Sequence, residues 1–181
     1  MSITITIPLG LRQLSGRLRN TEITPAKITQ ILRRAGPLLV GQSKLTFRDS
    51  RDPYGEPWAP LAKSTIANRK HGGSVPLVDT GALRNSINFS VGGDTLRIGP
   101  NVGYGLIHQT GGQTPPRTIL PKNGKALVFF IGGVKLIRKS VKHPGSKIPR
   151  RAYLPEERGL PDSWRNVIQE KVSLTLKVSL G

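Results

Sequence analysis

Apolar and polar positions change their period several times along the chain, and each period predicts a different kind of element. Residues 3–7 alternate between isoleucine and threonine, which predicts a half-buried strand. Leu11, Leu14 and Leu18 follow at the spacing of a short amphipathic helix. The first part of the chain is therefore expected to mix strand and helix.

The longest helical pattern begins at Thr24-Pro25. Threonine is a good N-cap residue, and proline is tolerated at the first helical position. Gly36-Pro37 lies inside the pattern, and we expect a kink or break there because proline removes a backbone hydrogen bond and clashes with the preceding turn. The apolar face of this helix consists of Ile28, Ile31, Leu32, Ala35, Leu38, Leu39 and Leu45.

A hairpin is predicted in the middle of the chain. Residues 87–91 and 96–98 alternate between apolar and polar side chains, and residues 92–94 provide a turn. Before it, residues 48–60 are predicted to form a loop and residues 63–70 a short helix. Residues 81–86 are predicted to form a second short helix, capped by Asp79 or Thr80. After the hairpin, residues 104–110 are predicted to form a third, which ends at Gly111-Gly112.

A second hairpin joins residues 126–131 and 134–139 through a two-residue Gly132-Gly133 turn. Long polar loops lie on both sides of it, which indicates an arm at about residues 113–150 rather than a packed layer.

The end of the chain has two competing interpretations. Residues 162–171 have helical spacing, whereas residues 172–180 alternate as a strand does, although a continued helix would also fit. Together these elements predict an α+β fold. We expect one domain over residues 1–181, with a small antiparallel sheet packed by helices and a protruding hairpin arm.

Charge narrows the range of partners. The 181 residues carry 28 Lys and Arg against 10 Asp and Glu, a formal net charge of +18. Such a charge attracts phosphate groups or an acidic protein face. Between residues 135 and 151 the chain holds seven cations and no acid, and this run could contact DNA, contact an acidic neighbour, or simply be solvated.

The chemistry of an enzyme is not evident in the sequence. There is no cysteine, the three histidines are scattered, and no spacing resembles a metal site or a phosphate-binding loop, so no cofactor is expected. Asp79-Thr80-Gly81 matches the triplet of aspartic proteases, but it leads into a polar helical turn and is better explained as a helix cap. His108 is best explained as a histidine that is at least half buried, with a hydrogen-bond partner. No apolar stretch reaches the ~18–20 residues that span a membrane.

Five ordered segments resemble one family. They read GEPWAPL at residues 55–61, PLVDTGALRNSI at 76–87, LRIG at 96–99, YGLIHQTGG at 104–112 and HPGSKIPRRAYLP at 143–155. Over about residues 28–170 the chain is similar to the virion morphogenesis, or tail-completion, family of Mu-like and related phages. Gly105, Thr110 and Tyr153 stand where that family's pattern has alanine, an aromatic residue and phenylalanine, and Arg150 and Ala152 also depart from it.

The resemblance implies a non-enzymatic virion protein that acts in tail completion and head–tail joining. It would be made in the cytoplasm of the host bacterium and would form a ring, expected to be hexameric, in the neck or at the top of the tail. Its neighbours would be the head–tail connector and the tail terminator or tail tube proteins, with packaged DNA in the channel as a further contact. The alternative from charge alone is a small basic nucleic-acid-binding protein.

The residues expected to matter fall into two groups. The core or motif positions are Trp58, Leu61, Leu77, Thr80, Gly81, Leu83, Ile87, Tyr104, Ile107, His108 and Gly111. The positions expected to contact a subunit, a ring or DNA are Lys135, Arg138, Lys139, Lys142, Lys147, Arg150, Arg151 and Tyr153.

Overall fold

The computed structural model describes residues 24–67, 69, 73–131 and 133–178, and the strand and short helix predicted before residue 24 lie outside that range. The described elements are the helices α2 (Pro25–Asp49), α3 (Lys63–Ala67), α4 (Ala82–Ser86), α5 (Gly105–Thr110) and α6 (Asp162–Val178), with the strands β1 (Ile87–Gly92), β2 (Thr95–Pro100), β3 (Gly112–Gln113), β4 (Arg117–Ile119), β5 (Leu127–Ile131), β6 (Val134–Arg138), β7 (Val141–His143) and β8 (Lys147–Ile148). The fold is α+β, as predicted. The expected small sheet is divided, in the described part, into four two-stranded antiparallel ladders.

Helix α2 begins where its cap residues predict. The Thr24 hydroxyl accepts a hydrogen bond from the backbone N–H of Lys27 at 3.3 Å, and Pro25 occupies the first turn. Of the kink or break predicted at Gly36-Pro37, the break does not occur, because the helix continues through Pro37 to Asp49. Gly36 lies directly against the ring of Phe89, where any side chain at residue 36 would clash. Packing on the neighbouring hairpin thus holds the helix through a position that local propensity disfavours.

The β1–β2 hairpin covers one side of α2. Its register pairs Ile87 with Pro100 and Gly92 with Thr95, which leaves Gly93 and Asp94 as the turn. Gly93 has a φ of 58°, as a tight hairpin turn requires. The Thr29 hydroxyl donates a hydrogen bond to the Gly93 carbonyl at 3.0 Å, which ties the turn to the first turns of α2.

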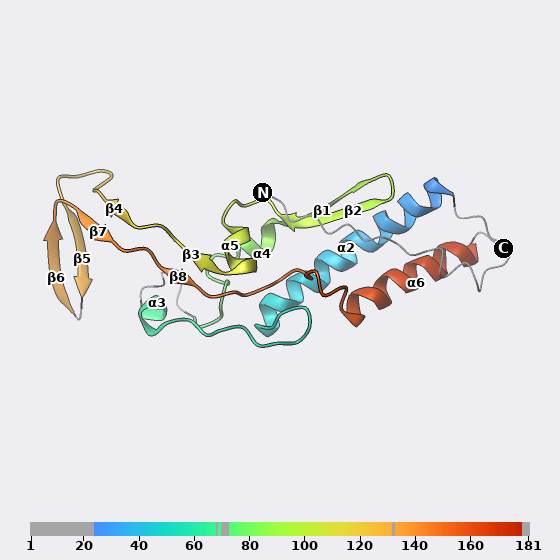
Figure 1. Ribbon diagram of the computed structural model, residues 1–181, viewed down its shortest axis with the longest axis horizontal. Helices are drawn as coiled ribbons and strands as arrows, with labels where there is room; N and C mark the ends of the chain where they lie inside the picture. Colours follow the sequence, from blue (N-terminus) through green and yellow to red (C-terminus); the bar gives the residue numbers. More distant parts are fainter. Residues whose placement is uncertain (1–23, 68, 70–72, 132, 179–181) are drawn as a thin grey trace.

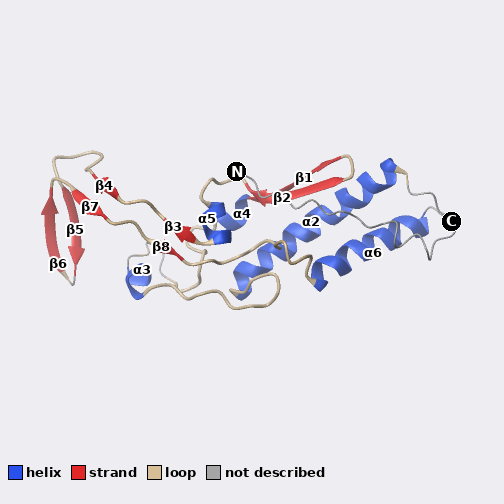
Figure 2. Ribbon diagram, in the orientation of Figure 1, coloured by secondary structure: helices blue, strands red, loops and turns tan. Residues whose placement is uncertain are grey.

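Helix α6 covers another side of α2, so that α2 lies between the β1–β2 hairpin and α6 (Figure 2). Trp164, Ile168, Val172 and Thr175 are buried at helical spacing along it. The strand interpretation of residues 172–180 is therefore wrong as far as Val178, and the helix alternative is the one that forms. The apolar alternation misleads because Leu174 points to solvent while Thr175 is buried.

The core extends from this three-layer stack toward the C-terminal end of α2. Phe47 packs against Trp58 with perpendicular rings 5.4 Å apart and against Tyr153 at 5.4 Å. Leu83 and Ile87 are buried in the same cluster, whereas the predicted face residues Leu38 and Leu45 lie at the surface.

The arm projects from this body as a long antiparallel ribbon, with β5 and β6 at its far end (Figure 1). The loops that the sequence predicts beside the hairpin are partly paired: β3 pairs with β8 and β4 with β7. Thr114 and Ser146 add further hydrogen bonds between the two sides. The Thr114 N–H donates to the Ser146 carbonyl at 2.9 Å, and the Ser146 N–H donates to the Thr114 hydroxyl at 2.7 Å. The arm is thus a series of short antiparallel ladders, and it ends in the predicted hairpin of β5 and β6.

Trp58→Ala should destabilise the body by about 3–5 kcal/mol, because it removes a buried indole and leaves a cavity beside Phe47. Urea-induced unfolding followed by circular dichroism measures this loss. Leu38→Ala is the control, because Leu38 lies on α2, the helix that carries Phe47, but is 42% exposed. This substitution should change the unfolding free energy by about 0.5 kcal/mol or less. Equal effects of the two substitutions would contradict the assignment of Trp58 to the core.

Candidate functional site

Two of the other sequence motifs, at residues 55–61 and 104–112, meet around one extended segment, residues 150–154. The segment lies between α2, α5 and the Trp58 loop, and residues 151–154 are buried. The Trp58 indole N–H donates to the Ala152 carbonyl at 2.8 Å, and the Ser43 hydroxyl donates to the Tyr153 carbonyl at 2.7 Å. Side chains thus satisfy backbone groups that have no strand partner, as buried polar groups require.

Gln109 holds the other edge of this segment. Its side-chain oxygen accepts hydrogen bonds from the backbone N–H groups of Tyr153 at 3.0 Å and Leu154 at 3.1 Å. Its amide nitrogen donates to the Leu154 carbonyl at 2.9 Å. Gln109 is buried, and its amide therefore acts as a short substitute for a neighbouring strand.

Tyr153 fills the space beneath α5. Its hydroxyl donates to the Gly105 carbonyl at 2.9 Å. Burial raises the pKa of the Tyr153 phenol to about 12, so the phenol stays protonated and remains a donor at neutral pH. Tyr153 was expected to contact a neighbouring subunit, but it is completely buried within its own chain.

Glycine is required where α5 approaches this segment. A β-carbon on Gly105 would lie 2.8 Å from the Tyr153 hydroxyl oxygen and 2.6 Å from Cγ of Pro100. A β-carbon on Gly111, whose φ is 73°, would lie 2.9 Å from the Arg150 nitrogen. The two departures noted in the sequence are thus linked, because the extra hydroxyl of Tyr153 occupies the space next to the missing methyl of Gly105.

Arg151 closes the segment toward the Trp58 loop. Its guanidinium donates to the carbonyls of Ala59 at 2.7 Å and Pro60 at 2.9 Å, and its backbone N–H donates to the His108 carbonyl at 2.8 Å. Burial, and then repulsion from Arg69, lowers the pKa of the Arg151 guanidinium. Arg151 was expected to contact DNA or a neighbour, but with 5% exposure it serves the interior of its own chain.

A second set of polar contacts, centred on Asp52, joins the loop after α2 to the chain after residue 154. The buried Asp52 carboxylate accepts hydrogen bonds from the backbone N–H groups of Tyr54 at 2.8 Å and Glu56 at 3.0 Å. It also pairs with Arg158 at 2.9 Å, and the Arg158 guanidinium lies 3.6 Å from the centre of the Tyr54 ring. Arg150 pairs with Glu156 in the same network, so this member of the basic run already has an acidic partner.

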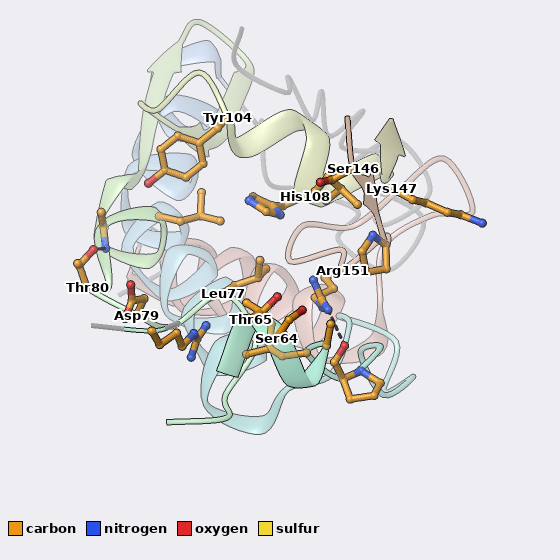
Figure 3. A pocket seen from close by; sticks show the side chains of 18 of the residues that line it. Ser64, Thr65, Leu77, Asp79, Thr80, Tyr104, His108, Ser146, Lys147 and Arg151 are labelled. Atoms are coloured by element: carbon orange, nitrogen blue, oxygen red, sulfur yellow. Dashed lines mark hydrogen bonds between the residues drawn. The ribbon is translucent and has the colours of Figure 1, made fainter. Parts of the chain in front are cut away.

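Above the segment the motifs line an open groove of about 950 Å³. Figure 3 shows His108 and Arg151 directed into it, with Tyr104 at one side and Leu77, Asp79 and Thr80 at another, while Lys147 extends away. The lining also includes Leu61, Ser64, Thr65, Arg69, Gly81, Leu83 and Ile148. Ile107 lies outside the groove and packs near Gly112.

Two backbone positions shape the wall of the groove. Leu77 has a φ of 60° and Gly81 a φ of 76°, and Gly81 rather than Asp79 or Thr80 is the residue before α4. The Thr80 hydroxyl accepts a hydrogen bond from the Ala82 N–H at 3.3 Å. Asp79 is exposed and is the one acid among the described residues of the lining, so no second carboxylate stands opposite the Asp-Thr-Gly triplet there.

His108 is half buried at the floor of the groove. Its ring meets Tyr104 edge-on at 6.1 Å, and its Nδ1 atom is buried without a hydrogen-bond partner among the described residues. Burial first, and the nearby positive charge of Arg151 second, lower the pKa of the His108 imidazole. The imidazole is therefore neutral at physiological pH, and the hydrogen-bond partner expected from the sequence is not seen for Nδ1.

The remaining members of the basic run lie on the arm. Lys135, Arg138, Lys139, Lys142 and Lys147 are exposed there. The described residues contain no group of three or more His, Asp or Glu side chains that could hold a metal ion. No helix within the described ranges is long and apolar enough to cross a membrane.

Sequence reasoning missed three residues that the structure brings to the centre. Gln109 follows His108 in the motif at residues 104–112. It lies four residues after Gly105 and therefore on the same helical face, and this spacing was a signal that Gln109 faces the interior. Ser43 and Asp52 gave no such signal, because each bonds to a segment about a hundred residues away in the sequence.

Gly105→Ala should destabilise the protein, because the new methyl meets both the Tyr153 hydroxyl and Pro100. Adding Tyr153→Phe should recover part of the loss by removing one of the two clashes. A double-mutant cycle on unfolding free energies measures the coupling, which we expect to be favourable by about 1 kcal/mol. Strictly additive effects would contradict the linkage between the two positions.

The stability of the protein should fall as the pH drops through about 6.5, the value of an unperturbed histidine, toward the lower pKa of folded His108. In that window the unfolded chain binds the proton more readily than the folded chain. Urea unfolding across this pH range, compared with His108→Gln, isolates the contribution, and the variant should lose less stability on acidification. Identical pH profiles would show that His108 is not the group responsible.

The comparison with protein families agrees with this arrangement. A model described as the phage virion morphogenesis family matches residues 10–177, a span that includes the Trp58 loop, the groove, the arm and the buried segment. Neither the comparison with curated proteins nor that with solved structures gives a match. The match covers nearly the whole sequence and includes every motif that converges on residues 150–154, and the chain therefore belongs to the phage virion morphogenesis family.

Proposed function

We propose that this chain is a non-enzymatic structural protein that completes the tail of a phage particle and joins it to the head. Membership in the virion morphogenesis family supports a role in particle assembly. The observation that carries the finer proposal is the division of the molecule into a locked body and a projecting arm with cations and no acid (Figure 1). Such an arm is suited to reaching a neighbouring protein in a larger assembly.

The proposed assembly is a ring in the neck or at the top of the tail, with six as the expected number of subunits. A ring closes through head-to-tail contacts between two different surfaces of each subunit. The body offers an open groove of about 950 Å³, and the arm offers a second, separate surface. The contacts between copies would use other parts of the body, and the groove and the arm would face the proposed neighbours, the head–tail connector and the tail terminator or tail tube proteins.

The arm should depend on its partners for a fixed position. It consists of two-stranded ladders, and isolated two-stranded hairpins are marginally stable in water. Its side chains are mostly exposed or half-exposed, so little of it packs on the body. Contact with a neighbour would provide the burial that the arm lacks.

A passive binding role also fits the groove better than catalysis does. His108 lies beside Arg151 rather than beside a carboxylate that would orient it as a general base. The serines and threonines that line the groove, Ser64, Thr65, Thr80 and Ser146, are exposed. We therefore propose that the groove receives a segment of protein.

The second candidate is a basic nucleic-acid-binding protein, for which the charge of +18 is the supporting observation. Packaged DNA in the channel would be one such ligand. A stacking surface for single strands is not well supported, because aromatic residues make up only 5% of the sequence. Salt-dependent binding to a DNA duplex by the isolated protein would favour this candidate.

Replacing four arm cations by glutamine should leave the fold intact and lower the yield of infectious tailed particles. The negative groups of the neighbour that the arm contacts in the particle would lose their positive partners. The variant carries Lys135→Gln, Arg138→Gln, Lys139→Gln and Lys142→Gln. Plaque titre and electron microscopy of particles made with the variant measure the effect.

The matched control removes the same charge from the body. It changes four exposed cations, Arg33, Arg34, Lys63 and Arg97, to glutamine. This control should give a near-normal titre. A normal titre from the arm variant would show that the basic run is only a solvated surface.

A further inference from the structure

The hairpin at the end of the arm has two faces of different character. Val128 pairs with Ile137 and Phe130 with Lys135, and alternation along the strands puts these four side chains on one face. Val128, Phe130 and Ile137 are 56%, 67% and 56% exposed. We call these four residues the apolar tip face. Val134, paired with Ile131, belongs to the opposite face.

The apolar tip face is not covered by any described part of the same chain. The β5–β6 hairpin lies at the far end of the arm from the body (Figure 1). Val134, on the opposite face of the same hairpin, is 62% exposed and does not belong to this surface. Large apolar side chains gathered at a projecting end are typical of a contact surface for another macromolecule.

Charge decides which kind of protein would fit. From residue 95 to residue 155 the sequence has no acid, and the arm carries Arg117, Lys122, Lys125, Lys135, Arg138, Lys139, Lys142 and Lys147. Lys135 lies within the apolar tip face itself, opposite Phe130. A complementary surface would therefore have an apolar centre and acidic groups around it.

A second copy of this chain fits poorly. The chain as a whole has a net charge of +18, and its groove is lined by Arg69, Lys147 and Arg151 against the single acid Asp79 among the described residues. Placing a cationic tip there would bring like charges together. Charge thus disfavours the arm of one copy docking in the groove of the next.

Duplex DNA fits the cations of the arm but not its apolar face. Phosphate contacts come from Lys, Arg and polar groups, and valine, isoleucine and phenylalanine side chains contribute nothing to them. A tip that held DNA only through its phosphates would gain nothing from the exposed side chains of Val128, Phe130 and Ile137. The combination of apolar and cationic groups favours a protein.

We infer that the apolar tip face docks onto an acidic surface with an apolar centre, on a different structural protein of the same virion. The inference rests on the proposed function, because it takes the neighbour to be another virion component. Val128, Phe130 and Ile137 would be buried at the centre of the contact, and Lys135 would pair with a carboxylate of the neighbour.

The test measures binding of the purified full chain to each acidic structural protein of the virion, purified singly, and in parallel to a short DNA duplex and to itself. Val128→Thr with Ile137→Thr keeps the β-branched shapes and adds polar atoms to the apolar tip face. It should weaken binding to one acidic virion protein by about tenfold or more, whereas Val134→Thr, on the opposite face of the same hairpin, should change it by less than about twofold.

A second variant tests whether the threonine substitutions weaken binding only because they disturb the fold of the hairpin. Lys135→Glu leaves the apolar side chains in place and reverses the charge, and it should also weaken binding to the acidic protein by about tenfold or more. The inference is overturned if no acidic virion protein binds, if the duplex or a second copy binds and the threonine variant does not matter, or if Lys135→Glu leaves binding unchanged.

Particle assembly separates this inference from the proposed function. A phage that lacks the chain entirely should yield no infectious particles, and the threonine variant should not restore them. If the threonine variant restores a normal titre while the chain remains essential, the docking inference fails and the assembly role stands. If particles form normally without the chain, the proposed function fails as well.

Discussion

The extended segment of residues 150–154, which is buried from Arg151 onward, is the constraint on which the rest of the structure depends. It is extended yet has no neighbouring strand, so its backbone groups need other partners in the interior. Gln109, Ser43 and Trp58 provide them, from α5, α2 and the loop after α2. Three separate parts of the chain are thereby fixed to one another. The groove above this segment, and the direction in which the arm leaves the body, follow from that arrangement.

Local patterns predicted the elements whose geometry is set by near neighbours. The cap at Thr24, both hairpins and the stop at Gly111 were correct, because each depends on residues close together in sequence. Packing between distant segments overrode the local signal elsewhere. Helix α2 continues through Pro37, where it packs on the β1–β2 hairpin. Helix α6 remains helical to Val178 because packing against α2 buries one helical face of it.

The predicted site residues divide in the same way. Residues such as Trp58, Leu83 and Ile87 lie in the core, where motif and apolar pattern agree. Arg151 and Tyr153 have side chains that are usual at a contact surface, and the sequence alone gave no reason to bury them. Their hydrogen bonds go to carbonyls of Ala59, Pro60 and Gly105, groups that every residue has and that no side-chain pattern can reveal.

The resulting molecule has a body whose polar groups are largely satisfied internally and an arm whose cations and apolar tip face are not. That contrast supports a protein built to be completed by neighbours in a particle of the kind its family assembles. Electron cryomicroscopy of purified infectious particles tests this account most directly. It predicts copies of the chain in a ring where the tail meets the head, with each arm lying against another virion protein and the β5–β6 hairpin buried there. A particle without the chain, or one in which the arms extend freely into solvent, would contradict it.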